Sequence, residues 1–211
     1  MLTTIVIAKR PVPGQVKTRL TPPLTPSQAG AVAGAALADT LRAVTEMRTD
    51  HRILAISGDP TGWLPTGWET TPQPDGSLDT RLVSAFGAAG GGPAVLVGMD
   101  TPQLRGEQLE QFDPGAYDVC LGLANDGGYW SIGFADPAAH AAATINGIPM
   151  STPHTGRAQL RRLRELGLRV QLLAALTDVD TIADARHVAA IAPHTAFAAA
   201  LRSIESACVP A

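Results

Sequence analysis

Cysteine is scarce in this chain of 211 residues, and the chain also lacks a long apolar run and an excess of positive charge. The two cysteines, Cys120 and Cys208, are too few for a disulfide framework and do not have the spacing of a metal site. A formal net charge of −3 offers no basic surface for nucleic acid or an acidic membrane. Residues 1–8 are apolar, but they are too few to cross a membrane and do not have the layout of a signal peptide. We therefore expect a cytoplasmic protein without a nucleic-acid or membrane partner.

Three common ligand-binding signatures are missing as well. The P-loop pattern G-x-x-x-x-G-K-[ST] does not occur, because Lys17 follows Gly14 by three positions without the required second glycine. The dinucleotide pattern G-x-G-x-x-G is absent, so a Rossmann oxidoreductase has no support. The five histidines form no H-x-H or H-E-x-x-H pair, which argues against zinc.

The chain does contain an alternation of strand and helix patterns. Apolar, β-branched runs predict strands at residues 2–8, 52–57, 94–98, 117–123, 129–134 and 169–173. Helical patterns follow at residues 25–48, 78–89, 106–112 and 156–166, with two more from Thr181 onward. The first of these helices has a capping box at Thr25 and Gln28.

This alternation predicts a single α/β domain over residues 1–211, with a mixed, mostly parallel sheet and helices on both faces. The two closely spaced strands around Asp126 are expected to add the antiparallel element. Residues 60–76 are rich in Pro, Gly, Thr and Trp, and we expect them to form an exposed excursion that could cover the site.

The loop after the first strand concentrates positive charge. Lys9 and Lys17 are the only lysines of the chain, whereas the other fourteen of its sixteen positive residues are arginines. Ligands of open α/β sheets bind outside the carboxyl ends of the strands, and lysine and arginine together suit successive phosphates of a nucleotide. We expect nucleotide binding by Lys9, Arg10, Pro11, Gly14, Lys17 and Arg19, with Lys17 also catalytic. The alternative is that these cations only keep an exposed loop solvated.

Two aspartates follow strands at the same edge of the predicted sheet. Asp100 comes directly after the buried run at residues 94–98, and Asp126 lies in the turn before Tyr129. Mg2+ takes one or two protein carboxylates and fills its other positions with phosphate oxygens and water. We expect Asp100 and Asp126 to bind Mg2+, or Mn2+ in its place, and Asp100 to be catalytic. Asp126, Gly127, Gly128 and Tyr129 are also expected to bind the substrate, with the glycines leaving room for it; the alternative is that both aspartates stabilise turns or cap helices.

Other polar residues carry weaker signals. Gln73 and Arg81 flank a turn that leads into a helix, and they could reach the base or sugar of a nucleotide or simply be solvated. Asp178 and Asp180 precede a capping-box pattern at Thr181, so we interpret them as structural.

In their order along the chain, these motifs resemble one bacterial family. They are the loop from Lys9 to Leu20, Gly98-x-Asp100-x-Pro102, Asp126-Gly127-Gly128-Tyr129 and Asp178-Val179-Asp180-Thr181. The sequence is similar to the glycosyltransferase-A-like proteins known as radical-SAM/selenodomain-associated transferases, in the nucleotide-diphospho-sugar transferase superfamily. The resemblance implies the GT-A fold for the whole chain.

A more distant similarity to the molybdenum-cofactor and phospholactate guanylyltransferases implies that the first loop binds a nucleotide and that Asp100 binds Mg2+. The glycine-rich loop of the molybdenum-cofactor enzymes is replaced here by the proline-containing basic loop, and residues 148–152 lack the aromatic residue that many family members carry. The identity of the donor and the nature of the acceptor pocket are therefore undecided by the sequence.

Three functions remain in consideration. Nucleotidyl transfer from an NTP is slightly favoured, because four cations suit a triphosphate. Glycosyl transfer from an NDP-sugar is the alternative, and a non-catalytic nucleotide-binding protein is the third. In each case the partner is a nucleotide; the sequence does not identify the base or the small-molecule acceptor.

Overall fold

The computed structural model describes residues 2–60 and 64–207, and its centre is a seven-stranded sheet in the order β3-β2-β1-β4-β6-β5-β7. The strands are β1 Thr3–Lys9, β2 His51–Ser57, β3 Glu69–Pro72, β4 Ala94–Val97, β5 Val119–Ala124, β6 Tyr129–Phe134 and β7 Val170–Leu176. Neighbouring strands are parallel except at β6, which runs antiparallel to both β4 and β5. The predicted mixed, mostly parallel sheet with an antiparallel element near Asp126 is confirmed.

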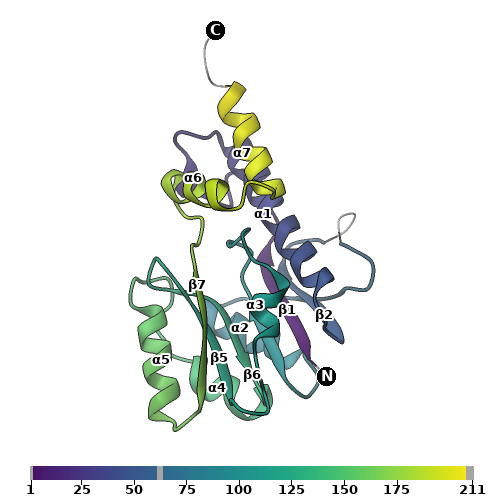
Figure 1. Ribbon diagram of the computed structural model, residues 1–211, viewed down its shortest axis with the longest axis vertical. Helices are drawn as coiled ribbons and strands as arrows, with labels where there is room; N and C mark the ends of the chain where they lie inside the picture. The colour runs from purple at the N-terminus through teal and green to yellow at the C-terminus, as the bar shows by residue number, and fades with distance from the viewer. Residues whose placement is uncertain (1, 61–63, 208–211) are drawn as a thin grey trace.

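Helices cover both faces of this sheet, as predicted (Figure 1). They are α1 Pro26–Glu46, α2 Leu78–Gly87, α3 Gly106–Glu110, α4 Pro137–Ile145, α5 Thr155–Glu165, α6 Ile182–Ile191 and α7 Ala196–Ala207, with a short 3-10 helix η1 at Thr18–Leu20. Helices α1 and α3 share one apolar core with the sheet, and α2, α4 and α5 share the other. None of the described helices is both long and apolar enough to cross a membrane.

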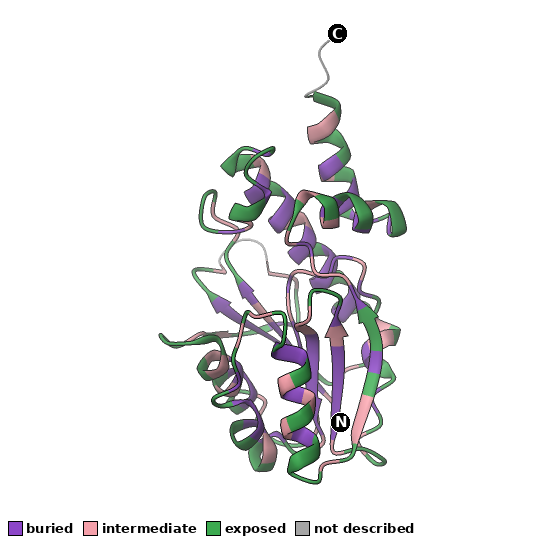
Figure 2. Ribbon diagram, turned by 90° about the vertical axis from the view of Figure 1, so that its left-hand side faces the viewer, coloured by how far each residue is buried: buried purple, intermediate pink, exposed green. Residues whose placement is uncertain are grey.

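The alternation of side chains along each strand supplies these two cores. In β1, Val6 and Ala8 pack on the α1 side, whereas Ile5 packs on the α2 side. The inner strands are buried along most of their length, whereas β3 and β7 at the two edges of the sheet are not, and the helices turn exposed residues outward (Figure 2). Helix α1 begins at the predicted capping box, in which Thr25 and Gln28 exchange side-chain and backbone hydrogen bonds.

A third apolar cluster lies beyond the sheet, where α6 and α7 pack on α1. It includes Leu20 of η1 and Phe197 and Leu201 of α7. The buried Asp39 of α1 accepts hydrogen bonds from the backbone N–H groups of Ala196 and Phe197 at the start of α7. The last helix is thereby fixed to the middle of the first.

Two predictions about local structure were wrong or incomplete. The exposed excursion over residues 60–76 contains the edge strand β3, and Trp68 packs against α1 and donates to the Thr45 hydroxyl. Residues 61–63 of that excursion lie outside the described residues. Helix α4 was not predicted, although Asp136 caps it and Pro137 occupies its first turn, because its alanine-rich sequence gives little apolar periodicity.

Candidate functional site

A cleft of about 750 Å³ opens at the carboxyl ends of the parallel strands. The loop after β1, the segment after β4, the turn between β5 and β6 and the segment between β7 and α6 all contribute to its walls. Such an edge is where open α/β sheets bind ligands. The sequence predicted a ligand site at this edge of the sheet, and the structure has a cavity there that is large enough for a nucleotide.

Lys17 lies at the centre of the charged part of the cleft. Its ammonium is 2.7 Å from an oxygen of Asp100 and 3.4 Å from Asp180, and its side chain is only 8% exposed. Burial acts to lower the pKa of Lys17, but the carboxylates of Asp100, Asp180 and Asp178 outweigh burial, and the pKa is raised. The ammonium is therefore fully charged at neutral pH.

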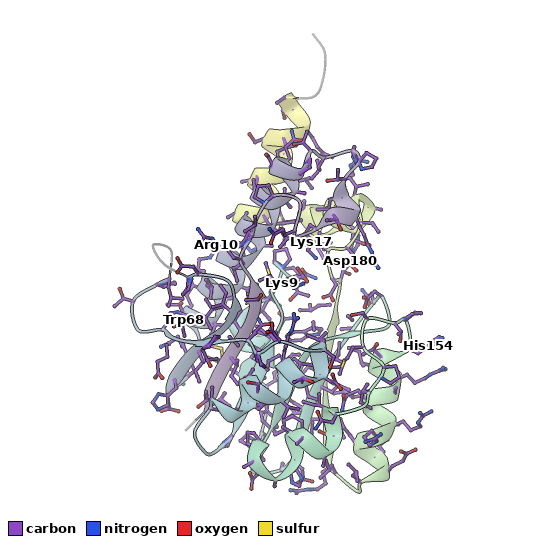
Figure 3. All side chains as sticks on the ribbon, turned by 180° about the vertical axis from the view of Figure 1, so that it is seen from behind. Lys9, Arg10, Lys17, Trp68, His154 and Asp180 are labelled. Carbon is purple, nitrogen blue, oxygen red and sulfur yellow. The ribbon has the colours of Figure 1, made fainter. Side chains whose placement is uncertain are left out.

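The backbone at Lys17 is in the left-handed region, with φ of 48°. This conformation is uncommon for a residue other than glycine, and here it directly precedes η1. The loop carries Arg19 to the same group, where its guanidinium is 3.1 Å from the other oxygen of Asp180. Figure 3 shows Lys9, Lys17 and Asp180 near one another, with Trp68 and His154 toward opposite sides.

Around Lys17, the cleft contains more carboxylates than cations. Burial, followed by the charges of Asp100 and Asp126, raises the pKa of Asp178 to about 7, with Lys17 acting in the opposite direction. The described residues contain no group of three His, Cys, Asp or Glu side chains arranged to hold a metal. The carboxylate oxygens of Asp100 and Asp126, which line the cleft, are donors of the kind that a hard cation such as Mg2+ takes one or two at a time, with phosphate and water completing its shell.

Not all residues predicted to bind the nucleotide line this cleft. Lys9, Lys17 and Arg19 do, whereas Arg10 and Pro11 line a separate groove beside α1. The reason is that the chain leaves β1 still paired with β2, through Arg10 N and Ser57 O, so that Lys9 and Arg10 point to different sides. Arg10 packs against Gly58 and is 3.9 Å from Asp59. Arg10 and Pro11 therefore lie outside the cleft that Lys9, Lys17 and Arg19 share, and nucleotide binding by these two residues stays a prediction.

In the loop after β1, the prolines lie against α1 and the glycine forms a turn. A Cβ at Gly30 would come 3.3 Å from Pro13, which is tighter than ordinary contact, so this glycine lets the loop lie close on α1. A Cβ at Gly34, one helical turn on, would be at an ordinary 3.8 Å from Pro11. Gly14 has φ of +78° and lines neither cavity. Gly14 thus serves the turn, and its part in nucleotide binding stays a prediction.

The turn between β5 and β6 also differs from expectation. A Cβ at Gly127 would lie 2.1 Å from the Pro153 carbonyl oxygen, and a Cβ at Gly156 would lie 2.3 Å from that of Gly128. Gly156 N donates to Gly127 O over 2.8 Å. The space beside Gly127 is filled by the protein, so this glycine allows close backbone packing and does not leave room for a ligand.

The remaining predicted residues do face the cleft. Asp126, Gly128 and Tyr129 line it, and burial raises the pKa of the Tyr129 phenol. The Gln73 amide donates to the backbone oxygens of Ala8 and Ala55, over 2.7 and 2.8 Å. Arg81 lines the cleft with its Nε buried and without a hydrogen-bond partner among the described residues, so it is not simply solvated.

Sequence reasoning missed the contribution of Asp178 and Asp180. The predicted capping box at Thr181 and Asp184 is present. Asp178 and Asp180 precede it and line the cleft. The usable signal was their position directly after β7. The loop at residues 150–153 also lines the cleft; in the sequence, only the family resemblance pointed to this segment, as part of an acceptor pocket.

The sequence from residue 28 to residue 152 matches a family model described as an uncharacterized protein conserved in bacteria (DUF2064). The chain belongs to the DUF2064 family. The matched part includes Asp100 and Asp126 but not the basic loop at residues 9–19. No curated protein matches this DUF2064 chain.

Solved structures share its fold. A protein of Desulfovibrio desulfuricans G20, provisionally assigned as a nucleotide-diphospho-sugar transferase, is 25% identical with a TM-score of 0.87, over 97% of this chain and 95% of that one. The 2-C-methyl-D-erythritol 4-phosphate cytidylyltransferase of Thermus thermophilus is 17% identical with a TM-score of 0.56, over 92% and 100%. Rv0371c of Mycobacterium tuberculosis H37Rv, solved in complex with manganese, is 22% identical with a TM-score of 0.54, over 89% and 97%. This DUF2064 protein therefore has the nucleotide-diphospho-sugar transferase fold.

Proposed function

We propose that this DUF2064 protein is a Mg2+-dependent transferase with a nucleotide donor, and that it transfers a nucleotidyl group from an NTP to a small-molecule acceptor. The observation that carries the proposal is the 2.7 Å contact between Lys17 and Asp100 inside the cleft of about 750 Å³. A group suited to phosphate and a group suited to a metal ion thus meet in one ligand-sized space.

The donor phosphates would be bound by Lys9, Lys17 and Arg19. Each charge-assisted hydrogen bond contributes roughly 1.5–3 kcal/mol, so three cations can hold a triphosphate before the base is recognised. Gln73 and Arg81 are the candidates for the base or the sugar. Both amide hydrogens of Gln73 are used by Ala8 and Ala55, which leaves its oxygen as an acceptor, while Arg81 Nε remains a donor.

Asp100 and Asp126 would hold the metal ion, Mg2+ or in its place Mn2+. When bound, the ion supplies positive charge to the phosphate oxygens as the bond to the leaving group breaks. Lys17 and Arg19 lie where they could bind the departing pyrophosphate. The acceptor would then approach from the side of Tyr129 and residues 150–153, which also line the cleft.

Glycosyl transfer from an NDP-sugar is the second candidate. It is favoured by the similarity to the Desulfovibrio protein, which is assigned to nucleotide-diphospho-sugar transferases and covers nearly the whole chain. The same phosphate and metal residues would serve, because a diphosphate is also held by cations and a metal ion. The two reactions differ in the product that leaves.

The first experiment is a thermal-shift screen of the four NTPs and of NDP-sugars, with and without Mg2+. We expect a Mg2+-dependent rise in melting temperature with one nucleotide, because a ligand that binds only the folded state stabilises it. A panel of phosphorylated sugars and alcohols is then tested for turnover. Pyrophosphate release supports nucleotidyl transfer, and NDP release without pyrophosphate supports the glycosyl alternative.

Asp100→Asn is the decisive variant, and Glu107→Gln is its control because that carboxylate is exposed on α3, outside the cleft. Asp100→Asn should lose the Mg2+-dependent part of the shift and reduce turnover at least ~100-fold, as expected when charge stabilisation of the transition state is removed. Undiminished turnover of this variant with Mg2+ present would refute the metal role. Nucleotide binding without turnover of any acceptor would favour the non-catalytic alternative.

A further inference from the structure

We propose that the Lys17 ammonium is a resident counter-ion that a divalent cation must displace from Asp100, after which the displaced ammonium binds the nucleotide phosphates. The inference rests on the proposed function, because it takes Asp100 as a ligand of that cation. It goes further by making metal binding and nucleotide binding depend on the movement of one side chain.

The geometry makes Lys17 a competitor for the carboxylate. Its ammonium is already 2.7 Å from Asp100 Oδ1, as close as hydrogen-bonded ion pairs come, and 3.4 Å from Asp180. A divalent cation bound to Asp100 would lie within a few ångströms of this ammonium in a partly buried region, where like charges repel strongly. Both cations therefore cannot occupy their preferred positions together.

Lys17 can yield without being left unpaired. Its backbone is fixed at the start of η1, but its four-carbon side chain can rotate away from Asp100 while it stays near Asp180. Asp180 is held in place independently by Arg19, which binds its second oxygen. The backbone of the same segment is fixed as well, because Val179 N donates to Asp100 O over 2.9 Å.

Charge balance explains why such an exchange is needed. Asp178 lines the same cleft, where the charges of Asp100 and Asp126 act on it and the Lys17 ammonium, 2.7 Å from Asp100, opposes their effect. With Lys17 in place, the carboxylates are partly neutralised and a metal ion gains less by binding. Phosphates that attract Lys17 away would restore the full negative charge, so the metal ion and the nucleotide should each strengthen the binding of the other.

The test measures Mn2+ binding by electron paramagnetic resonance in the absence of nucleotide. Lys17→Met removes the competing charge while keeping a long side chain, and we expect it to bind Mn2+ at least ~10-fold more tightly than the unmodified protein. Lys9→Met removes the same charge from an exposed position of the same loop, without an ion pair to Asp100, and should change Mn2+ affinity by no more than about twofold. Nucleotide affinity should fall in Lys17→Met.

The outcomes separate this inference from the proposed function. If Asp100→Asn binds Mn2+ as well as the unmodified protein does, the metal site itself is wrong. If Asp100→Asn loses Mn2+ but Lys17→Met binds it no more tightly, only the exchange is wrong. Circular dichroism checks that Lys17→Met is folded, and Lys17→Gln serves if it is not. A crystal structure with Mn2+ and an NTP gives a second measurement: a Lys17 ammonium that still contacts Asp100 beside the bound ion would overturn the inference.

Discussion

Asp178 illustrates how burial next to other carboxylates changes the chemistry of one side chain. Its pKa in the folded protein is about 7, against an ordinary value of 3.8. Between these two values the folded protein binds a proton that the unfolded chain has released, so stability falls as the pH rises from about 4 to about 7. Asp178→Asn should remove this pH-dependent loss and be more stable than the unmodified protein at pH 8, by ~1 kcal/mol or more, in urea denaturation.

Asp118 provides a control of opposite sign. Its pKa is lowered to about 2 by hydrogen bonds from Arg169, so its stabilising effect is present above about pH 4 and is lost as the pH falls toward 2. Asp118→Asn should therefore be less stable than the unmodified protein at pH 7. A stability profile of Asp178→Asn that parallels the unmodified protein between pH 4 and 8 would contradict the assignment of this titration to Asp178.

The sequence predicted the position of some residues relative to the cleft but not of others. Lys17 and Asp100 were found because both follow strands whose carboxyl ends meet at one edge of the sheet. Arg10 was misplaced because it adjoins Lys9 in the sequence but faces the other way. The environment of Gly127 could not be predicted either, since its contact with Pro153 depends on tertiary packing.

At the scale of elements, α7 depends on one buried carboxylate of α1. Asp39 is 2% exposed and accepts the N–H groups of Ala196 and Phe197, which would otherwise lack partners. Asp39→Ala should destabilise the protein by roughly 2–4 kcal/mol in urea denaturation, because two backbone donors, one of them on the buried Phe197, lose their acceptor. Hydrogen exchange should increase first in α7.

Arg42→Ala is the matched control for this contact. Arg42 pairs with Asp39 over 2.6 Å, but its side chain is 49% exposed, and its removal leaves the hydrogen bonds to α7 in place. We expect a change below about 1 kcal/mol. Equal losses in both variants would mean that the ion pair, rather than the capping of α7, holds the helix.

The elements that the sequence predicted share strong signals. Buried strands with β-branched runs and helices with capping boxes were found, with ends differing by a few residues. The edge strand β3 has the polar sequence Glu-Thr-Thr-Pro and pairs only with β2, so it did not show the apolar pattern of a buried strand. Helix α4 is mostly alanine, which packs well but contributes little to periodicity.

At the scale of the whole molecule, Cys120 reports on the integrity of the central sheet. It is fully buried in β5, and burial raises the pKa of its thiol to about 12, so it should not react in the folded state. In a Cys208→Ser background, we expect a thiol reagent to modify Cys120 only as fast as the protein unfolds globally in guanidinium. Cys120→Ser in the same Cys208→Ser background, which leaves no thiol, measures the background reaction. Rapid labelling of Cys120 without denaturant would show that the sheet opens locally.

The paired glycines between the β5–β6 turn and the start of α5 have a consequence for evolution. Because a carbonyl group fills the space where a side chain of Gly127 or Gly156 would stand, neither position can change without a compensating shift of the other segment. Length variation among homologues should then accumulate in the intervening stretch, from the start of α4 to Pro149. Such variation would leave the cleft and Asp126 unchanged, because none of residues 137–149 lines the cleft.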